Sequence, residues 1–232
     1  MSTFVLVHGA WHGAWCWERL VPELETRGHT SIAMDLPVDD GSATFDDYAR
    51  AVTEAARGVD GDVVLVGHSL GSMVIPLVAT TRPASAMIFL CGLIPNFHGT
   101  PWDDAPKMEE PGIFDGLSHD ADGSTAWSTL EAATDAFYSD CAPDDARRAF
   151  ERLRHQNSKS LWGRSYPLDT WPTARRVAII CAADRTVTPA FSRAVCRPRL
   201  GVDPIEMPGG HSPFLARPGE LADLLVSVVA AQ

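Results

Sequence analysis

The sequence predicts an α/β fold in which a six-stranded, mostly parallel sheet has helices on both faces and carries a small helical insertion. Short runs of β-branched and other apolar residues alternate with helix-like segments along most of the 232 residues. Strands that are apolar along both faces are typical of a parallel sheet covered by helices. A chain of this length with 45% hydrophobic residues is sufficient for one large core.

The strands and helices of the core follow from this alternation in chain order. Apolar runs predict strands at 4–9, 30–35, 63–67, 86–92, 176–184 and 204–207. The intervening segments predict helices within 15–27 and 44–57, over 70–81, near 189–197 and near 218–230. Residues 1–94 and 169–232 are therefore expected to form the two parts of one core.

Residues 95–168 interrupt the alternation and predict a helical cap insertion. They include several prolines and helix-compatible stretches such as 144–153. A structureless loop of this length within a compact domain is uncommon. The first half of the segment is acidic, which we interpret as solvated surface; an entrance that disfavours anionic substrates is the alternative.

Composition excludes several kinds of partner and site. The net charge of −11 argues against binding to nucleic acid or to anionic membranes. No run reaches the ~18 apolar residues that a membrane-spanning helix needs, and no signal peptide is visible. The five cysteines lack metal-type spacing and are expected to be reduced thiols. We therefore expect a cytoplasmic protein without a metal site.

A serine between two glycines marks the end of the third predicted strand. Gly67-His68-Ser69-Leu70-Gly71 fits the G-x-S-x-G pattern of a strand-to-helix turn that exposes a nucleophilic serine. Glycine lacks the Cβ that would obstruct such a strained turn. The apolar strand before Ser69 and the helical pattern after it favour the nucleophile over a tight turn with a passive serine.

A serine hydroxyl needs a base to take its proton and a carboxylate to orient that base. His211, in the loop Pro208-Gly-Gly-His-Ser-Pro, is predicted to be the base, in preference to seven other histidines. Asp184 ends a predicted strand and lies between Ser69 and His211 in the chain, which is the order expected for such a triad. Asp35 also ends a strand, but it precedes the serine, and we interpret it as holding a loop.

Two backbone N–H groups are predicted to stabilise the oxygen that becomes negative during the reaction. One is the N–H of Leu70 at the start of a helix, and the other is the N–H of Ala10 in the first strand-to-helix loop. Nearby apolar side chains could line a cavity or form the core of the cap: Trp11, Trp102, Met108, Phe114, Trp127, Leu130 and Trp162.

These segments resemble the plant methylesterase and hydroxynitrile lyase group of the α/β-hydrolase superfamily and its bacterial esterase relatives. The resemblance is carried by FVLVHGAWHGAWCW at 4–17, GHSLGS at 67–72, FYSDCAPDDA at 137–146, and the motifs around Asp184 and His211. It implies an α/β-hydrolase fold with a cap over the active site. It also implies a catalytic triad of Ser69, Asp184 and His211, with an oxyanion hole from Ala10 and Leu70.

Two departures favour an esterase over a lyase. The resemblance implies that a hydroxynitrile lyase of this group would have a lysine directly after the triad histidine and a threonine in the oxyanion loop. This chain has Ser212 and Ala10 at those positions. We therefore expect a cofactor-free serine carboxylesterase for small, largely apolar esters, methyl or aryl esters among them. The alternatives are lactone opening or C–C bond cleavage by the same triad, or a small-molecule receptor with slow turnover. The sequence leaves open whether the protein forms a homodimer.

Overall fold

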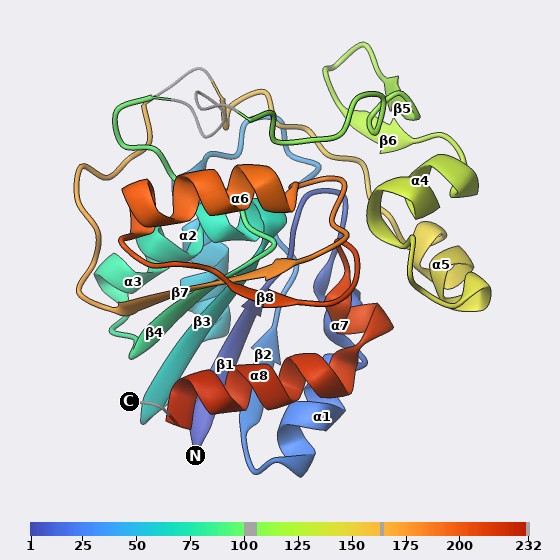
Figure 1. The fold of residues 1–232 in the computed structure, drawn as a ribbon. Helices are drawn as coiled ribbons and strands as arrows, with labels where there is room; N and C mark the ends of the chain where they lie inside the picture. Colours follow the sequence, from blue (N-terminus) through green and yellow to red (C-terminus); the bar gives the residue numbers. More distant parts are fainter. Residues whose placement is uncertain (100–105, 163–164, 231–232) are drawn as a thin grey trace.

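The computed structural model describes residues 1–99, 106–162 and 165–230, and its centre is a six-stranded sheet (Figure 1). The strand order is β2-β1-β3-β4-β7-β8, and every neighbouring pair in it is parallel. The strands are β1 (Ser2–Val7), β2 (Thr30–Ala33), β3 (Asp62–His68), β4 (Ala86–Leu90), β7 (Arg175–Cys181) and β8 (Ile205–Met207). The predicted α/β fold with six strands is confirmed.

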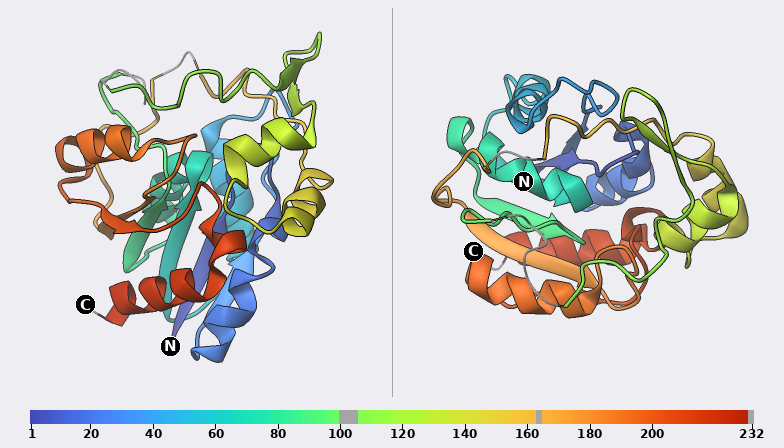
Figure 2. Two further views of the ribbon diagram at one scale, coloured as in Figure 1. Left: turned by 45° about the vertical axis from the view of Figure 1, so that its right-hand side comes forward. Right: turned by 90° about the horizontal axis from the view of Figure 1, so that it is seen from above.

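Helices pack on the sheet in two layers, and each layer has its own apolar cluster. The helical elements of the core are η1 (Ala14–Trp17), α1 (Leu20–Thr26), α2 (Phe45–Ala55), η2 (Ser69–Met73), α3 (Ile75–Thr81), α6 (Pro189–Val195), the π-helical turn η3 (Cys196–Leu200), α7 (Pro213–Ala216) and α8 (Pro218–Ala230). Buried residues of α2, α3 and α6 share one cluster, and those of α1, α7 and α8 share the other. Helices α1 and α8 lie side by side (Figures 1 and 2).

The near-continuous apolar sequence of the strands follows from this arrangement. Val63 and Leu65 of β3 face the first cluster, whereas Val64 and Val66 face the second. Successive side chains of a strand point to opposite faces, so a strand covered on both sides needs apolar residues at every position. Among the described helices, none combines the length and the apolar character that crossing a bilayer requires.

The insertion contains helices, as predicted, and also a two-stranded sheet that the sequence did not predict. Antiparallel β5 (Leu117–His119) and β6 (Thr125–Trp127) precede α4 (Leu130–Phe137) and α5 (Pro143–Phe150). These four elements lie together at one side of the molecule (Figures 1 and 2). The turn between the strands is stabilised by Asp122 Oδ1, which accepts hydrogen bonds from the N–H and Oγ of Ser124. The predicted first and last residues of the insertion, 95 and 168, stay a prediction.

The start of η2 packs closely against the end of β1. A Cβ on Gly71 would lie 2.5 Å from the carbonyl oxygen of Val7 and 2.7 Å from that of His8. Both neighbours are backbone atoms of a central strand and its loop, so neither can move without disturbing the sheet. Gly71 is therefore required for the contact between the two backbones.

We expect Gly71→Ala to destabilise the fold by about 1–3 kcal/mol or more, because the added methyl group overlaps fixed backbone atoms. Gly219→Ala is the matched control, since the nearest atom to a Cβ on Gly219 is Glu23 Oε2 at 3.7 Å. Alanine favours helix α8, so the control should be neutral or stabilising. Urea unfolding followed by circular dichroism measures both; equal stability of Gly71→Ala and wild type would contradict the packing argument.

Candidate active site

Ser69 lies at the sharp turn between β3 and η2. Its φ is +50°, in the region that side chains other than glycine rarely adopt. A Cβ on Gly67 would lie 2.6 Å from the carbonyl oxygen of Gly71, which explains the first glycine of the motif. The carbonyl of Ser69 accepts a hydrogen bond from the N–H of Leu93 at 3.1 Å. The surrounding structure thus holds a half-buried serine in a strained conformation.

Asp184 and His211 are brought together in a buried hydrogen-bonded pair. His211 Nδ1 lies 2.8 Å from Asp184 Oδ2, and each side chain is 1% exposed. Asp184 Oδ1 accepts two further hydrogen bonds, from the N–H groups of Thr186 and Val187, at 2.9 Å each. A carboxylate only accepts, so Nδ1 carries the proton and Nε2 of His211 has a free lone pair.

The loop that carries His211 is attached to the residue before Ser69. His68 Nε2 donates to the carbonyl oxygen of His211 at 2.8 Å, and the two rings lie 4.6 Å apart. Burial lowers the pKa of His68 well below its usual value, so this ring is neutral. Its role is to support the backbone of His211. The loop also packs closely against residues 139 and 140, since a Cβ on Gly210 would lie 2.9 Å from Ser139 Oγ.

The first strand-to-helix loop lies against the serine. A Cβ on Gly9 would approach Ser69 Cβ to 2.9 Å. His8 Nδ1 donates to the carbonyl of Gly9 at 2.8 Å, and its Nε2 accepts from the N–H of Leu36 at 2.9 Å. Because the peptide is planar, the bond to the Gly9 carbonyl also fixes the direction of the Ala10 N–H. Leu70 is the second residue of η2, where an N–H has no partner within the helix.

A second buried histidine fixes the next peptide of this loop. His12 Nδ1 donates to the carbonyl of Ala10 at 2.7 Å, and Tyr138 Oη donates to His12 Nε2 at 2.9 Å. Burial lowers the pKa of His12 to about 3 and that of His8 to about 4, so both rings are neutral near pH 7. Both predicted oxyanion donors thus belong to backbone that neighbouring groups hold in place.

Sequence reasoning treated His8 and His12 as competing bases and missed their structural role. Neither has a carboxylate partner among its hydrogen bonds. Tyr138 lies 126 residues from His12 in the chain. Only its position inside the FYSDCAPDDA stretch that carried the resemblance could have drawn attention to it. Asp35 holds a loop, as predicted, because its Oδ1 accepts from the N–H of Ala14 at 2.7 Å.

Three aromatic residues that the sequence left open as cavity lining or cap core lie in the apolar core beside the insertion: Trp11, Phe114 and Trp127. Trp11, Phe114, Trp127 and Phe137 contact one another, with ring centroids 4.9–6.1 Å apart. Met108 and Trp162 pack on the cluster of α2 and α3. Leu130 is half-buried, and Trp102 lies outside the described residues. Two members of the aromatic cluster lie near the candidate site: Trp11 directly follows Ala10, and the ring of Phe137 lies 5.6 Å from that of His211.

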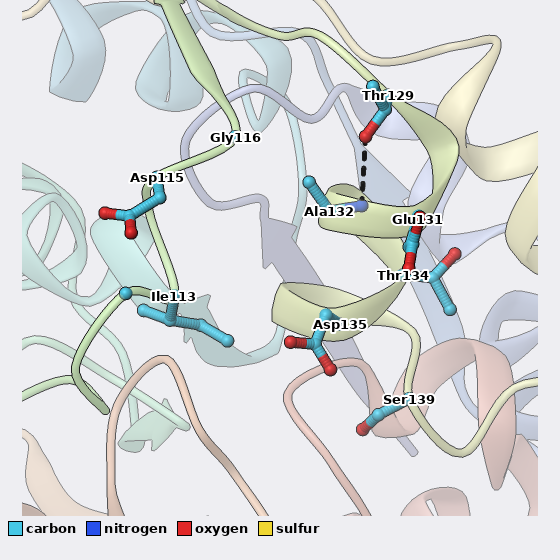
Figure 3. A pocket seen from close by; sticks show the side chains of 10 residues that line it. Ile113, Asp115, Gly116, Thr129, Glu131, Ala132, Thr134, Asp135 and Ser139 are labelled. Atoms are coloured by element: carbon cyan, nitrogen blue, oxygen red, sulfur yellow. Dashed lines mark hydrogen bonds between the residues drawn. The ribbon is translucent and has the colours of Figure 1, made fainter.

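Two of the hollows that adjoin the insertion lie beside residues 106–116. The one in Figure 3 has a volume of about 650 Å³ and lies between residues 112–116 and α4, with Asp115, Glu131 and Asp135 on its wall. The other, about 680 Å³, is lined by 106–111 together with residues of the loop after β7, including Asp184. Ser69 lines neither of these two hollows. Asp135 on the wall of the first hollow forms an ion pair with Arg185.

One group of metal-ligand type occurs among the described residues. Ligand atoms of Cys91, Asp184 and His211 lie within 4.8 Å of one another, and all three residues are buried. The hydrogen bond between Asp184 and His211 already accounts for two members of this group. The absence of a cofactor stays a prediction from the sequence.

The neutral histidines should make the stability of the protein depend on pH. Their pKa values are lower in the folded state than the usual 6.5, so the unfolded chain binds protons more readily and stability falls as pH drops from about 6.5 toward 4. Near pH 4.5, His12→Asn should reduce this slope by about 1.4 kcal/mol per pH unit, the value for one proton. Asparagine keeps a donor for the Ala10 carbonyl.

Urea unfolding between pH 4 and 7 measures the slope. His119→Asn, at an exposed position in β5, should keep the wild-type slope. A slope in His12→Asn equal to that of wild type would show that His12 is not buried in its neutral form.

Comparisons with known proteins identify the family of the chain. The model of the alpha/beta hydrolase family matches residues 4–224. Methylesterase 9 of Arabidopsis thaliana is 27% identical over 98% of each chain. The alpha-hydroxynitrile lyase of the same plant is 28% identical over 97% of this chain and 96% of its own.

A solved structure shares the fold along the whole length. The pyrethroid hydrolase of Sphingobium faniae JZ-2 superposes with a TM-score of 0.86 at 24% identity, covering 99% of this chain and 98% of that one. The resemblance to plant methylesterases and hydroxynitrile lyases that the motifs indicated is confirmed. Together with the matched family model, these similarities show that the chain belongs to the alpha/beta hydrolase family.

Proposed function

We propose that the protein is a serine carboxylesterase that hydrolyses small, largely apolar carboxylic esters through an acyl-enzyme. The observation that carries this proposal is the buried hydrogen bond between Asp184 and His211, in a loop attached to the residue before a strained serine. Such a pair generates a base with a free Nε2 near neutral pH. The esterases among the relatives support the same reaction class.

The first half of the reaction acylates Ser69. Its Oγ attacks the ester carbonyl carbon while His211 Nε2 takes the hydroxyl proton, and the carboxylate of Asp184 stabilises the imidazolium. The N–H groups of Ala10 and Leu70 donate to the oxygen that becomes negative. When the intermediate collapses, the C–O bond to the alcohol breaks, and the alcohol leaves with the proton from Nε2.

The second half releases the acid. His211 Nε2 takes a proton from water, whose oxygen attacks the acyl carbon. The bond between that carbon and Ser69 Oγ then breaks, and Oγ recovers the proton from the imidazolium. The two halves together consume one ester and one water and release one alcohol and one acid.

Two features favour neutral esters over the chemistry of the lyase relative. Cleavage of a cyanohydrin produces cyanide, which a neighbouring cation would stabilise, and the residue after His211 is the buried Ser212. The oxyanion loop offers the methyl group of Ala10 where a threonine would add a hydroxyl. The cytoplasmic location is proposed from the sequence alone.

Wild-type protein should hydrolyse p-nitrophenyl and methyl esters of graded acyl length, and Ser69→Ala should lose at least about 10³-fold in kcat/KM, because the nucleophile is removed. Ser227→Ala is the matched control, since this exposed hydroxyl donates only to the carbonyl of Leu224 in α8. The control should retain wild-type activity.

A fluorophosphonate probe tests the nucleophile without a choice of ester. It should label wild type and Ser227→Ala at Ser69, identified by peptide mass spectrometry, and should leave Ser69→Ala unlabelled. Asp184→Asn should slow the labelling, because His211 then loses its orienting charge. Undiminished hydrolysis by Ser69→Ala, or no labelling of folded wild type, would contradict the proposal.

A further inference from the structure

Three residues other than glycine have a positive φ in the described part of the chain. They are Trp11 at +58°, Ser69 at +50° and Cys91 at +45°. The first belongs to the oxyanion loop, and the second is the proposed nucleophile. Backbone strain of this kind concentrates at functional sites, where the surrounding structure enforces it. Cys91 is the one of the three without a role in the reaction described above.

Cys91 follows β4 directly, and its backbone is held in place. Its N–H donates to the carbonyl of Ile179 in β7 at 2.8 Å. Glycine would adopt a φ of +45° without strain, yet this position carries a thiol whose residue is fully buried. A strained backbone at a residue with a side chain suggests that the position of the thiol matters. The neighbouring residues show where the thiol lies.

The thiol lies beside the Asp184–His211 pair. Cys91 Sγ, a carboxylate oxygen of Asp184 and a ring nitrogen of His211 are all within 4.8 Å of one another. Asp184 Oδ1 accepts two backbone N–H groups, and Oδ2 accepts from His211. A carboxylate has about four lone-pair sites, so one remains for a weak donor such as a thiol.

We propose that Cys91 is a positioning residue of the active site: its S–H donates to the carboxylate of Asp184 and holds that carboxylate in the orientation that receives Nδ1–H of His211. The contact with Cys181 and burial raise the pKa of Cys91 well above its usual value, so the thiol stays protonated and acts as a donor. This inference rests on the proposed function of the site.

The proposed bond has an electrostatic consequence that a packing role lacks. A donor to the carboxylate disperses its negative charge, so Asp184 stabilises the imidazolium of His211 less strongly. Removing the thiol should therefore raise the pKa at which His211 gains its second proton. The other titratable groups that face the pair are the neutral rings of His68 and His12, the thiol of Cys181, and Asp140 beside the loop of Gly210.

The test compares three substitutions of Cys91. Cys91→Ala removes the donor, Cys91→Ser replaces it with a hydroxyl, and Cys91→Gly removes it while also relieving the backbone. In kcat/KM for p-nitrophenyl acetate against pH, the midpoint of the acidic limb should rise by about 0.5 unit in the alanine and glycine variants. In the serine variant the midpoint should equal that of wild type or lie lower.

Cys196→Ala is the matched control, because this cysteine is buried in the other apolar cluster. Its midpoint should be that of wild type. Wild-type midpoints in both Cys91→Ala and Cys91→Gly would overturn the proposal. So would a shift in the glycine variant alone, because relief of backbone strain would then explain it, or a shift in the alanine variant alone, because repacking around the methyl group would then explain it.

A second measurement separates this inference from the proposed function. The ring of His211 is titrated by NMR in the wild type and in the same variants, without substrate. The same rise in the His211 pKa is expected there in Cys91→Ala and Cys91→Gly. If no ester is hydrolysed but this rise is seen, the esterase proposal fails and the position of the thiol stands. If esters are hydrolysed and the His211 pKa stays constant, the role of Cys91 fails alone.

Discussion

The close contact between the η2 backbone and the end of β1 determines where the reactive groups lie. Because Gly71 has no Cβ, the first turn of η2 can lie directly against the carbonyls of Val7 and His8. The loop that begins at His8 must therefore pass beside Ser69, where Gly9 again leaves no room for a side chain. The N–H groups of Leu70 and Ala10 are brought to the same serine by this contact between backbones.

Buried histidines then distribute the roles around that contact. His8, His12 and His68 donate to backbone carbonyls, and burial keeps each of them neutral. An imidazole becomes a useful base when a carboxylate stabilises its charged form. Among the buried histidines of the described residues, His211 is the one whose hydrogen bond goes to a carboxylate. The same residue type therefore provides three structural donors and one candidate base.

The sequence was sufficient for the sheet and for the pairing of Asp184 with His211. A strand covered on both faces leaves a continuous apolar signal, and parallel strands bring the residues after their carboxyl ends to one edge. It was less accurate at strand ends. The strand expected at 176–184 stops at Cys181, because residues after it turn back so that the N–H groups of Thr186 and Val187 reach Asp184.

What the sequence could not predict depends on contacts between distant segments or on backbone angles. The pairing of β5 with β6 is short and involves few apolar residues, so its pattern is weak. The positive φ of Cys91 leaves no signal in the residue itself, since cysteine is not a residue that favours this region. The hydrogen bond between Tyr138 and His12 joins the insertion to the first loop, and no local pattern specifies it.

The insertion is therefore a structural part of the candidate site. The carbonyl of Ala136 in α4 accepts from Thr186 Oγ1 at 2.7 Å, two residues after Asp184. Tyr138, at the end of α4, holds His12 and through it the oxyanion loop. Helix α4 thus contacts both the segment of the acid and the segment of the oxyanion donors. A movement of α4 away from the sheet would break both buried hydrogen bonds and so release the segment of the acid and the segment of the oxyanion donors together.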